Sequence, residues 1–254
     1  MTSRIARIRF LDEMARFTST VLSPLLTPSY AMLMALSISP KVLDSVGSRI
    51  NLLIIILGIT CVLPMATIAL LHNFKFIKDK RMVKRDERLL PYIAATVFYL
   101  GAVWYLAYTH EPQWMVMFAA GGALACLIST LVNLKWKISA HMAGMGGLLG
   151  MLCQLDAMDL EVVSPAWMMF YIIVAIGLCG LLGSARMLLK RHTFMQVVAG
   201  WANGFLCVSL MMRSLSEPWF TPSRTAVPCL RHKSMKGTSA SWMRCNSAWY
   251  SSLV

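Results

Sequence analysis

The chain has 254 residues, of which 57% are apolar and only 14% are charged, and its formal net charge is +13. A soluble globular chain is about half apolar and about a quarter charged, so this composition excludes an ordinary soluble domain. It predicts an all-α, polytopic transmembrane helix bundle with about six or seven spans. A large positive charge would also fit a nucleic-acid partner. Here the basic residues lie at the ends of apolar segments, so we expect no nucleic acid.

The apolar segments follow one another at lengths that suit membrane spans. A spanning helix needs about 20 mostly apolar residues, because the hydrocarbon core is about 30 Å thick. We expect a basic N-terminal segment over 1–16, amphipathic or extended, followed by a transmembrane bundle over 17–213. The expected spans are Phe17–Ile38, Leu52–Leu71, Pro91–Thr109, Trp114–Asn133, Met142–Leu155, Ala166–Gly183 and Met195–Met212. Residues 214–254 are rich in serine, arginine and proline, and we expect them to form a disordered basic tail.

Two of these spans carry residues that change how a helix runs or packs. Pro24 and Pro28 weaken the first span, because an interior proline removes a backbone hydrogen bond. Four glycines between positions 144 and 150 lie in the fifth span, where small residues let helices approach closely. Helix packing alone is the simplest interpretation of these glycines.

The charged residues divide unequally between the two faces of the membrane. Counting spans places the segments 1–16, 72–90, 134–141 and 184–194 on one side, and together they hold 16 of the 24 basic residues. The connections on the other side hold only Lys41 and Arg49 against five acidic residues. By the positive-inside rule the basic face is cytoplasmic. Cations at span ends also reach lipid headgroups, which is the plainest account of Lys75, Lys135, Lys190 and Arg191.

Two histidines on the basic face call for a different account. His141 and His192 each begin a span, and each has a serine or an arginine nearby in the sequence. Histidine suits nucleophilic or proton-transfer chemistry near neutral pH, and the arginine fork matches phosphate oxygens. No Asp-rich motif of a magnesium site lies on this face, and no Cys/His cluster has zinc spacing. These groups therefore predict cleavage of a phosphate ester or pyrophosphate without a metal or other cofactor.

The order of these groups resembles the type 2 phosphatidic acid phosphatase superfamily, the lipid phosphatase and haloperoxidase-like membrane bundles. The family motifs are K-x6-R-P, P-S-G-H and S-R-x5-H-x3-D. The matching positions, which fall within roughly residues 50–212, are Arg81 and Arg88 for the first motif, Ser139 and His141 for the second, and Arg186 and His192 for the third. In the first motif the proline does not follow the arginine directly but comes three residues after Arg88, as Pro91.

The resemblance implies a role for each matched residue. His192 would be the nucleophile and His141 the general acid. The phosphate would be held by Arg81, Arg88, Ser139 and Arg186, and we expect this set to converge on one concave site.

The sequence departs from the third motif where glutamine, Gln196, replaces the aspartate. An aspartate there would fix the tautomer of the nucleophile and stabilise its positive charge, whereas glutamine supplies no charge. We expect Gln196 to modulate His192, with which it shares a helix face if the last span begins by His192.

Three hypotheses follow for the function. The first is a membrane phosphatase, a hydrolase of a lipid phosphate or a polyprenyl pyrophosphate, whose hydrocarbon tail stays in the membrane lipid. The second is a catalytically impaired relative that binds anionic lipid or a protein partner. The third is a transporter, although no acidic residue within a span indicates ion coupling. We expect the protein in the bacterial inner (plasma) membrane. Charge favours a cytoplasmic site, whereas many bacterial members of the resembled family act on the outer side.

Overall fold

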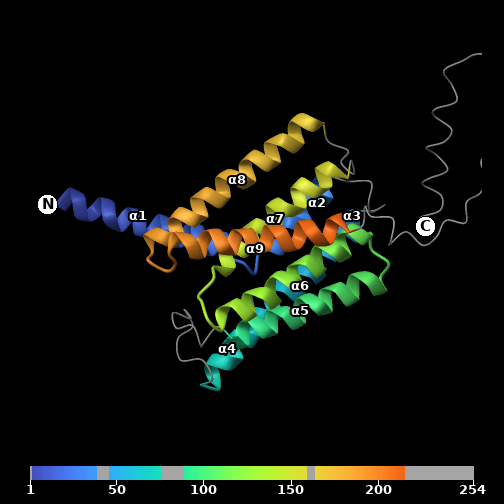
Figure 1. Ribbon diagram of the computed structural model, residues 1–254, viewed down its shortest axis with the longest axis horizontal. Helices are drawn as coiled ribbons and strands as arrows, with labels where there is room; N and C mark the ends of the chain where they lie inside the picture. The colour runs from blue at the N-terminus through green and yellow to red at the C-terminus, as the bar shows by residue number, and fades with distance from the viewer. Residues whose placement is uncertain (1, 39–45, 76–88, 159–163, 215–254) are drawn as a thin grey trace, which may run out of the picture. The chain divides into compact units, whose positions relative to one another are not determined.

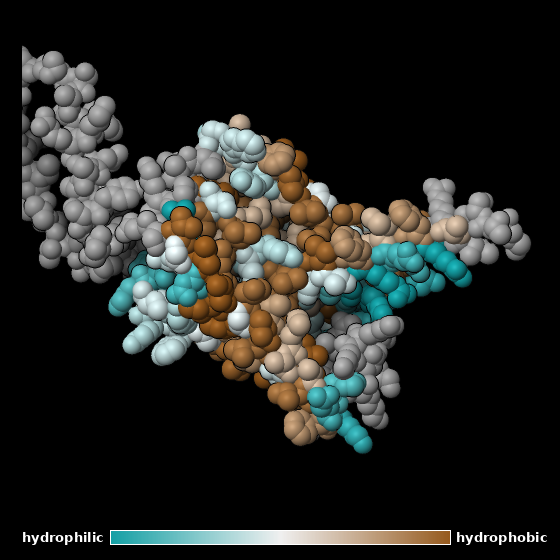
Figure 2. Space-filling model, turned by 180° about the vertical axis from the view of Figure 1, so that it is seen from behind, coloured by the Kyte–Doolittle hydropathy of each residue, from teal (hydrophilic) through white to brown (hydrophobic). Residues whose placement is uncertain are grey.

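The computed structural model describes residues 2–38, 46–75, 89–158 and 164–214, and every regular element among them is helical (Figure 1). Five helical stretches are long and apolar enough to cross a membrane: Val46–Asn73, Leu89–Tyr108, Gln113–Asn133, Pro165–Leu188 and Phe194–Arg213. Apolar side chains cover the middle of the surface seen in Figure 2, and hydrophilic side chains gather toward its ends. The expected all-α class is confirmed, and the helices fit an integral membrane protein. The count of six or seven spans stays a prediction.

The first expected span is divided into two helices. α1 (Thr2–Val21) takes in most of the basic segment 1–16, and α2 (Thr27–Ile38) follows after a turn. In the turn, the backbone nitrogens of Leu26 and Thr27 each donate to the carbonyl of Ser23, at 3.0 Å. Pro24 begins this turn, where its missing N–H interrupts no helical hydrogen bond.

The second span is one continuous helix with a local change of winding. It comprises α3 (Val46–Leu57), the π-helical turn η2 (Gly58–Val62) and α4 (Leu63–Asn73). Pro64 lies two residues beyond the π-helical turn and has no N–H to donate back into the helix. A π-bulge accommodates that loss, and the hydroxyl of Thr60 donates to the carbonyl of Ile56 at 2.8 Å.

The remaining helices run in chain order with short connections. They are α5 (Leu89–Tyr108), α6 (Gln113–Asn133), α7 (Ala140–Ala157), α8 (Pro165–Leu188) and α9 (Phe194–Arg213). Pro165 begins α8, where a proline fits the first turn. His110 and Lys190 follow α5 and α8 with positive φ angles of 56° and 51°, the left-handed conformation that often ends helices. The expected tail, 214–254, lies outside the described residues apart from Ser214.

α7 and α9 pack backbone against backbone, as the glycines predicted. A Cβ atom added to Gly204 would overlap the carbonyl oxygen of Ala143, and one added to Gly146 would overlap that of Trp201. A Cβ atom on Gly150 would lie 2.9 Å from the carbonyl oxygen of Phe205. Both helices contain a small-x-x-x-small pattern, which permits this close approach in membranes.

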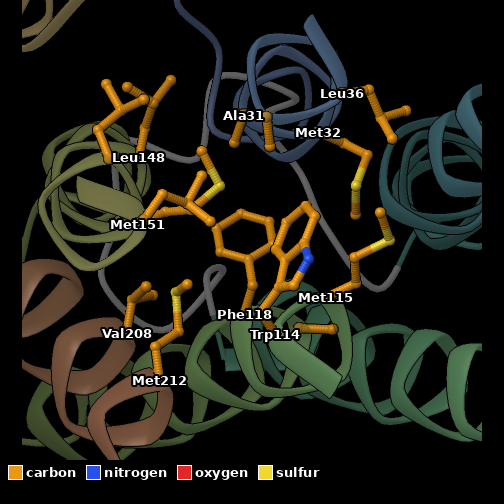
Figure 3. Packing of buried hydrophobic residues seen from close by; sticks show 14 of the residues in the cluster. Ala31, Met32, Leu36, Trp114, Met115, Phe118, Leu148, Met151, Val208 and Met212 are labelled. Atoms are coloured by element: carbon orange, nitrogen blue, oxygen red, sulfur yellow. The ribbon is translucent and has the colours of Figure 1, made fainter. Parts of the chain in front are cut away.

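The main apolar core lies at the end of the bundle away from His141 and His192. Figure 3 shows Trp114 and Phe118 of α6 surrounded by methionines from several helices, including Met115, Met151 and Met212. The cluster also includes residues at the end of α7 and the start of α8, such as Leu155 and Met168. It joins α2, α3, α5, α6, α7, α8 and α9 into one unit and thereby fixes how the helices stand at the opposite end.

Candidate functional site

His141, Arg186 and His192 meet at one cavity. His141 lies in the first turn of α7, Arg186 in the last turn of α8, and His192 in the short connection between α8 and α9. All three line a cavity of about 300 Å³. Because α7 starts at the end of the bundle where α8 stops, residues 45 and 51 positions apart in sequence come together. The structure therefore brings both predicted histidines and one predicted arginine to a single site.

His192 is oriented by Gln196. The imidazole is buried, with 7% of its surface exposed, and its Nδ1 lies 3.2 Å from Gln196 Oε1. The same oxygen accepts the backbone N–H of Thr193, also at 3.2 Å. Since that N–H can only donate, the amide atom facing both groups is the oxygen. Nδ1 of a neutral His192 therefore carries its hydrogen, and Nε2 keeps the lone pair that a nucleophile requires.

Gln196 contacts His192 from a helix cap and not, as predicted, from a helix face that the two residues share. A shared helix face required the helix to begin by His192, whereas α9 begins at Phe194 with Thr193 as its N-cap. Gln196 is the third helical residue of a capping box, in which the side chains of Thr193 and Gln196 bond each other's backbone nitrogens. The pattern Thr-x-x-Gln before an apolar run is a known signature of this motif. That pattern, present in the sequence, is the signal from which the correct helix start could have been found.

His141 and Arg186 both contact Ser19 of α1. His141 Nε2 lies 3.1 Å from the carbonyl oxygen of Ser19, and Arg186 Nη1 donates to the Ser19 hydroxyl, also at 3.1 Å. A carbonyl oxygen can only accept, so Nε2 of His141 carries a hydrogen. Ser19 is itself buried, with 8% of its surface exposed. The two histidines thus differ at Nε2: His141 carries a hydrogen there, and a neutral His192 carries a lone pair.

Ser139 stands beside the cavity. It is the N-cap of α7, it is fully buried, and its backbone nitrogen donates to the carbonyl of Gln196 at 3.3 Å. Its hydroxyl has no hydrogen-bond partner among the described residues, and Ser139 is not among the described residues that line the cavity. Ser139 therefore ties the start of α7 to the start of α9. Its predicted contact with phosphate stays a prediction.

Arg81 and Arg88 lie outside the described residues, which resume at Leu89. The third and fourth residues of α5, Pro91 and Tyr92, line the same cavity as the histidines. The start of α5 is therefore at the end of the bundle that carries His141 and His192, as counting spans predicted.

The chemistry that this arrangement supports is nucleophilic attack with proton transfer beside a fixed cation. Within the described ranges no group of three or more His, Cys, Asp or Glu side chains is placed to hold a metal ion. Comparisons of the chain with family models, curated proteins and solved structures gave no match. We therefore infer the function of the protein from the geometry of this site.

Proposed function

We propose that this protein is a membrane phosphatase that hydrolyses a lipid phosphate or a polyprenyl pyrophosphate through a histidine nucleophile, without a metal cofactor. The observation that carries the proposal is the pair of histidines on one cavity, next to Arg186, of which one has a hydrogen at Nε2 and the other a lone pair. A nucleophile needs an unprotonated nitrogen and a general acid needs a hydrogen to give. The long apolar helices support a substrate drawn from the membrane, and we assign the protein to the bacterial inner membrane.

In the first step Nε2 of His192 attacks phosphorus, and the bond from phosphorus to the leaving oxygen breaks. His141, in its imidazolium form, gives its Nε2 hydrogen to that oxygen and becomes a neutral imidazole, so the lipid leaves as an alcohol, or as a monophosphate from a pyrophosphate. Arg186 stabilises the negative charge that spreads over the phosphoryl oxygens. To do so, Arg186 and His141 must turn part of their hydrogen bonding from Ser19 to the substrate.

In the second step water attacks phosphorus and the bond from phosphorus to His192 breaks. His141, now unprotonated, accepts a proton from the water, and inorganic phosphate leaves. The phosphorylated imidazole is positively charged at the transition states, and Gln196 offers it an oxygen dipole but no full charge. We therefore expect slow turnover.

The neutral Gln196 also favours a second candidate, a catalytically impaired relative that binds anionic lipid or a protein partner through the same cations. In that case His192→Asn leaves lipid binding nearly unchanged, while Arg186→Ala weakens it most at low salt.

Phosphate release by purified protein, from a panel of lipid phosphates in the presence of EDTA, tests the proposal. We expect release by the wild type and none by His192→Asn. His110→Asn is the matched control, because His110 is exposed in the connection between α5 and α6, and its left-handed backbone tolerates asparagine. No release from any substrate by the wild type would favour the binding candidate.

A further inference from the structure

The cavity that holds the two histidines continues into the apolar interior of the bundle. On α7 it is lined by residues 140, 141, 143, 144 and 147, which share one helix face. On α6 it follows the face from Phe118 to Ser129, which at about 1.5 Å per residue is a length of about 16 Å. Its deeper lining is mostly hydrocarbon, with Ile68, Ala95, Phe118, Cys126 and Val208. It is therefore a slot with a polar end and an apolar end.

Three glycines in the lining of this slot have close neighbours, so that larger side chains there would crowd it. Gly144 lies one turn beyond His141, where a Cβ atom would lie 3.1 Å from Thr27 Oγ1 and 3.5 Å from Pro24 Cα. A Cβ atom on Gly147 would lie 3.3 Å from a methyl group of Val208, and one on Gly122 would overlap the ring of Tyr99. Gly144 lies between His141 and Gly147 in the lining from α7, and we call it the threshold of the slot, because a side chain there would meet Thr27 at close range.

We infer that the apolar end of the slot holds the hydrocarbon chain of a single-chain phosphate amphiphile, an alkyl, acyl or isoprenyl phosphate, inside the bundle. This inference depends on the proposed function for the phosphate end and differs from the expectation that the tail stays in the membrane lipid. Two observations carry it. The apolar space is continuous with His141, Arg186 and His192, so one molecule spans both ends. Its volume of about 300 Å³ is at the low end for ligand sites, which suits one chain and not two.

Photolabelling locates the chain directly. The probe is an alkyl phosphate with a diazirine at the far end of its chain, added to the full-length protein in lipid nanodiscs. We expect labelling of Phe118 and Val208, which line the slot, and competition by an unlabelled alkyl phosphate. Labelling of exposed apolar residues such as Leu181 of α8 or Leu206 of α9 would overturn the inference, as would the absence of labelling.

Variants that fill the slot sharpen the test. Gly144→Val narrows the threshold from α7, and Ala95→Leu fills the interior from α5, so the test does not depend on one variant folding. Each should lower labelling of Val208 at least tenfold. The matched control is Gly180→Val on α8, where an added Cβ atom meets nothing within 4 Å, and it should label like the wild type. Equal labelling in all three variants contradicts the slot.

Hydrolysis of short, water-soluble alkyl phosphates gives an independent measurement. KM should fall about fourfold per added methylene until the slot is filled and then stay level. A two-chain phosphatidic acid should be hydrolysed at least tenfold more slowly than its one-chain counterpart, and an equal rate would overturn the single-chain inference.

Labelling needs no turnover, which separates the two claims. Labelling of Phe118 without any phosphate release supports the chain site and contradicts the phosphatase. Phosphate release with labelling only at Leu181 or Leu206 supports the phosphatase and contradicts the chain site.

Discussion

At the end of the bundle that carries His141, Arg186 and His192, helices meet through directed hydrogen bonds and through glycine backbones. At the opposite end they meet through methionine and aromatic side chains, such as Met115 and Met212 around Trp114 (Figure 3). Methionine is flexible and fills irregular space, whereas a hydrogen bond or a backbone contact permits one geometry.

The two ends of the helix bundle therefore have different roles. The end with the methionine and aromatic cluster around Trp114, which we call the adaptable end, gives the helices their shared core. The end that carries His141, Arg186 and His192, which we call the rigid end, fixes the angles at which imidazole and guanidinium groups point into the cavity. A change at the rigid end should therefore have large effects on structure or activity, and a small change elsewhere should have little effect.

The largest effect is expected from Gly204→Ala at the α7–α9 contact. The added Cβ atom would overlap the carbonyl oxygen of Ala143, which is backbone and cannot rotate away. The helices must then separate, at a cost of about 3 kcal/mol or more. Thermal unfolding in detergent should show a large fall in Tm or no folded protein. Gly177→Ala on α8 is the matched control, because its Cβ atom meets nothing within 4 Å, and an equal Tm for the two variants would contradict the close contact.

The next effect concerns the charge beside His192. Gln196→Glu keeps the length of the side chain and the capping box and adds a carboxylate that stabilises the phosphorylated imidazole. Loss of a comparable carboxylate in a serine protease costs about 10⁴ in rate, which sets the upper limit for the gain in kcat. Gln196→Asp, the substitution that the family motif indicates, should gain less, because the shorter side chain reaches less well from its place in the capping box.

The control for that charge effect is Gln196→Met, which has a similar length and no acceptor. It should lower the free energy of unfolding by about 1 kcal/mol through the lost capping contact, seen as a lower Tm, and it should not raise kcat. A wild-type rate that none of these substitutions changes would place Gln196 outside the chemistry.

A smaller effect is expected from Ser19→Ala. The substitution leaves the Ser19 carbonyl for His141 but removes the hydroxyl that accepts from Arg186 Nη1. A hydrogen bond to a charged group contributes about 1.5–3 kcal/mol, so the Tm should fall measurably. Ser37→Ala is the matched control, because Ser37 is exposed on α2 and bonds only within its own helix, to Leu33. Equal stabilities of the two variants would show that Ser19 does not hold α1 to Arg186.

The sequence allowed the all-α class and the meeting of His141, Arg186 and His192 to be predicted, because span counting depends on apolar length and chain order alone. It also indicated Gln196 as the neighbour of His192, although the contact comes from a capping box that was overlooked and not from a helix face shared with His192. Ser19 could not have been found. A serine in a helix has no sequence signal for a contact 122 or 167 residues away, since such contacts depend on how α1, α7 and α8 pack. The break of the first span was signalled only by Pro24 and Pro28.

The smallest effect is expected at the adaptable end, from Glu111 in the connection between α5 and α6. Partial burial raises the pKa of this carboxyl group above its ordinary value, because burial disfavours the charged form. A raised folded-state pKa means that stability is highest below the unfolded-state pKa and falls as pH rises through the folded-state pKa. Near pH 7 the folded protein therefore carries the desolvation cost of the carboxylate, which solvent screening limits to less than about 1 kcal/mol.

Glu111→Gln removes this cost, so its Tm should exceed that of the wild type at pH 7, and the difference should vanish near pH 4. Glu13→Gln, at an exposed position on α1, is the control for the loss of a carboxylate charge as such. If Glu111→Gln gains nothing at pH 7, or gains equally at both pH values, burial does not control the titration of Glu111.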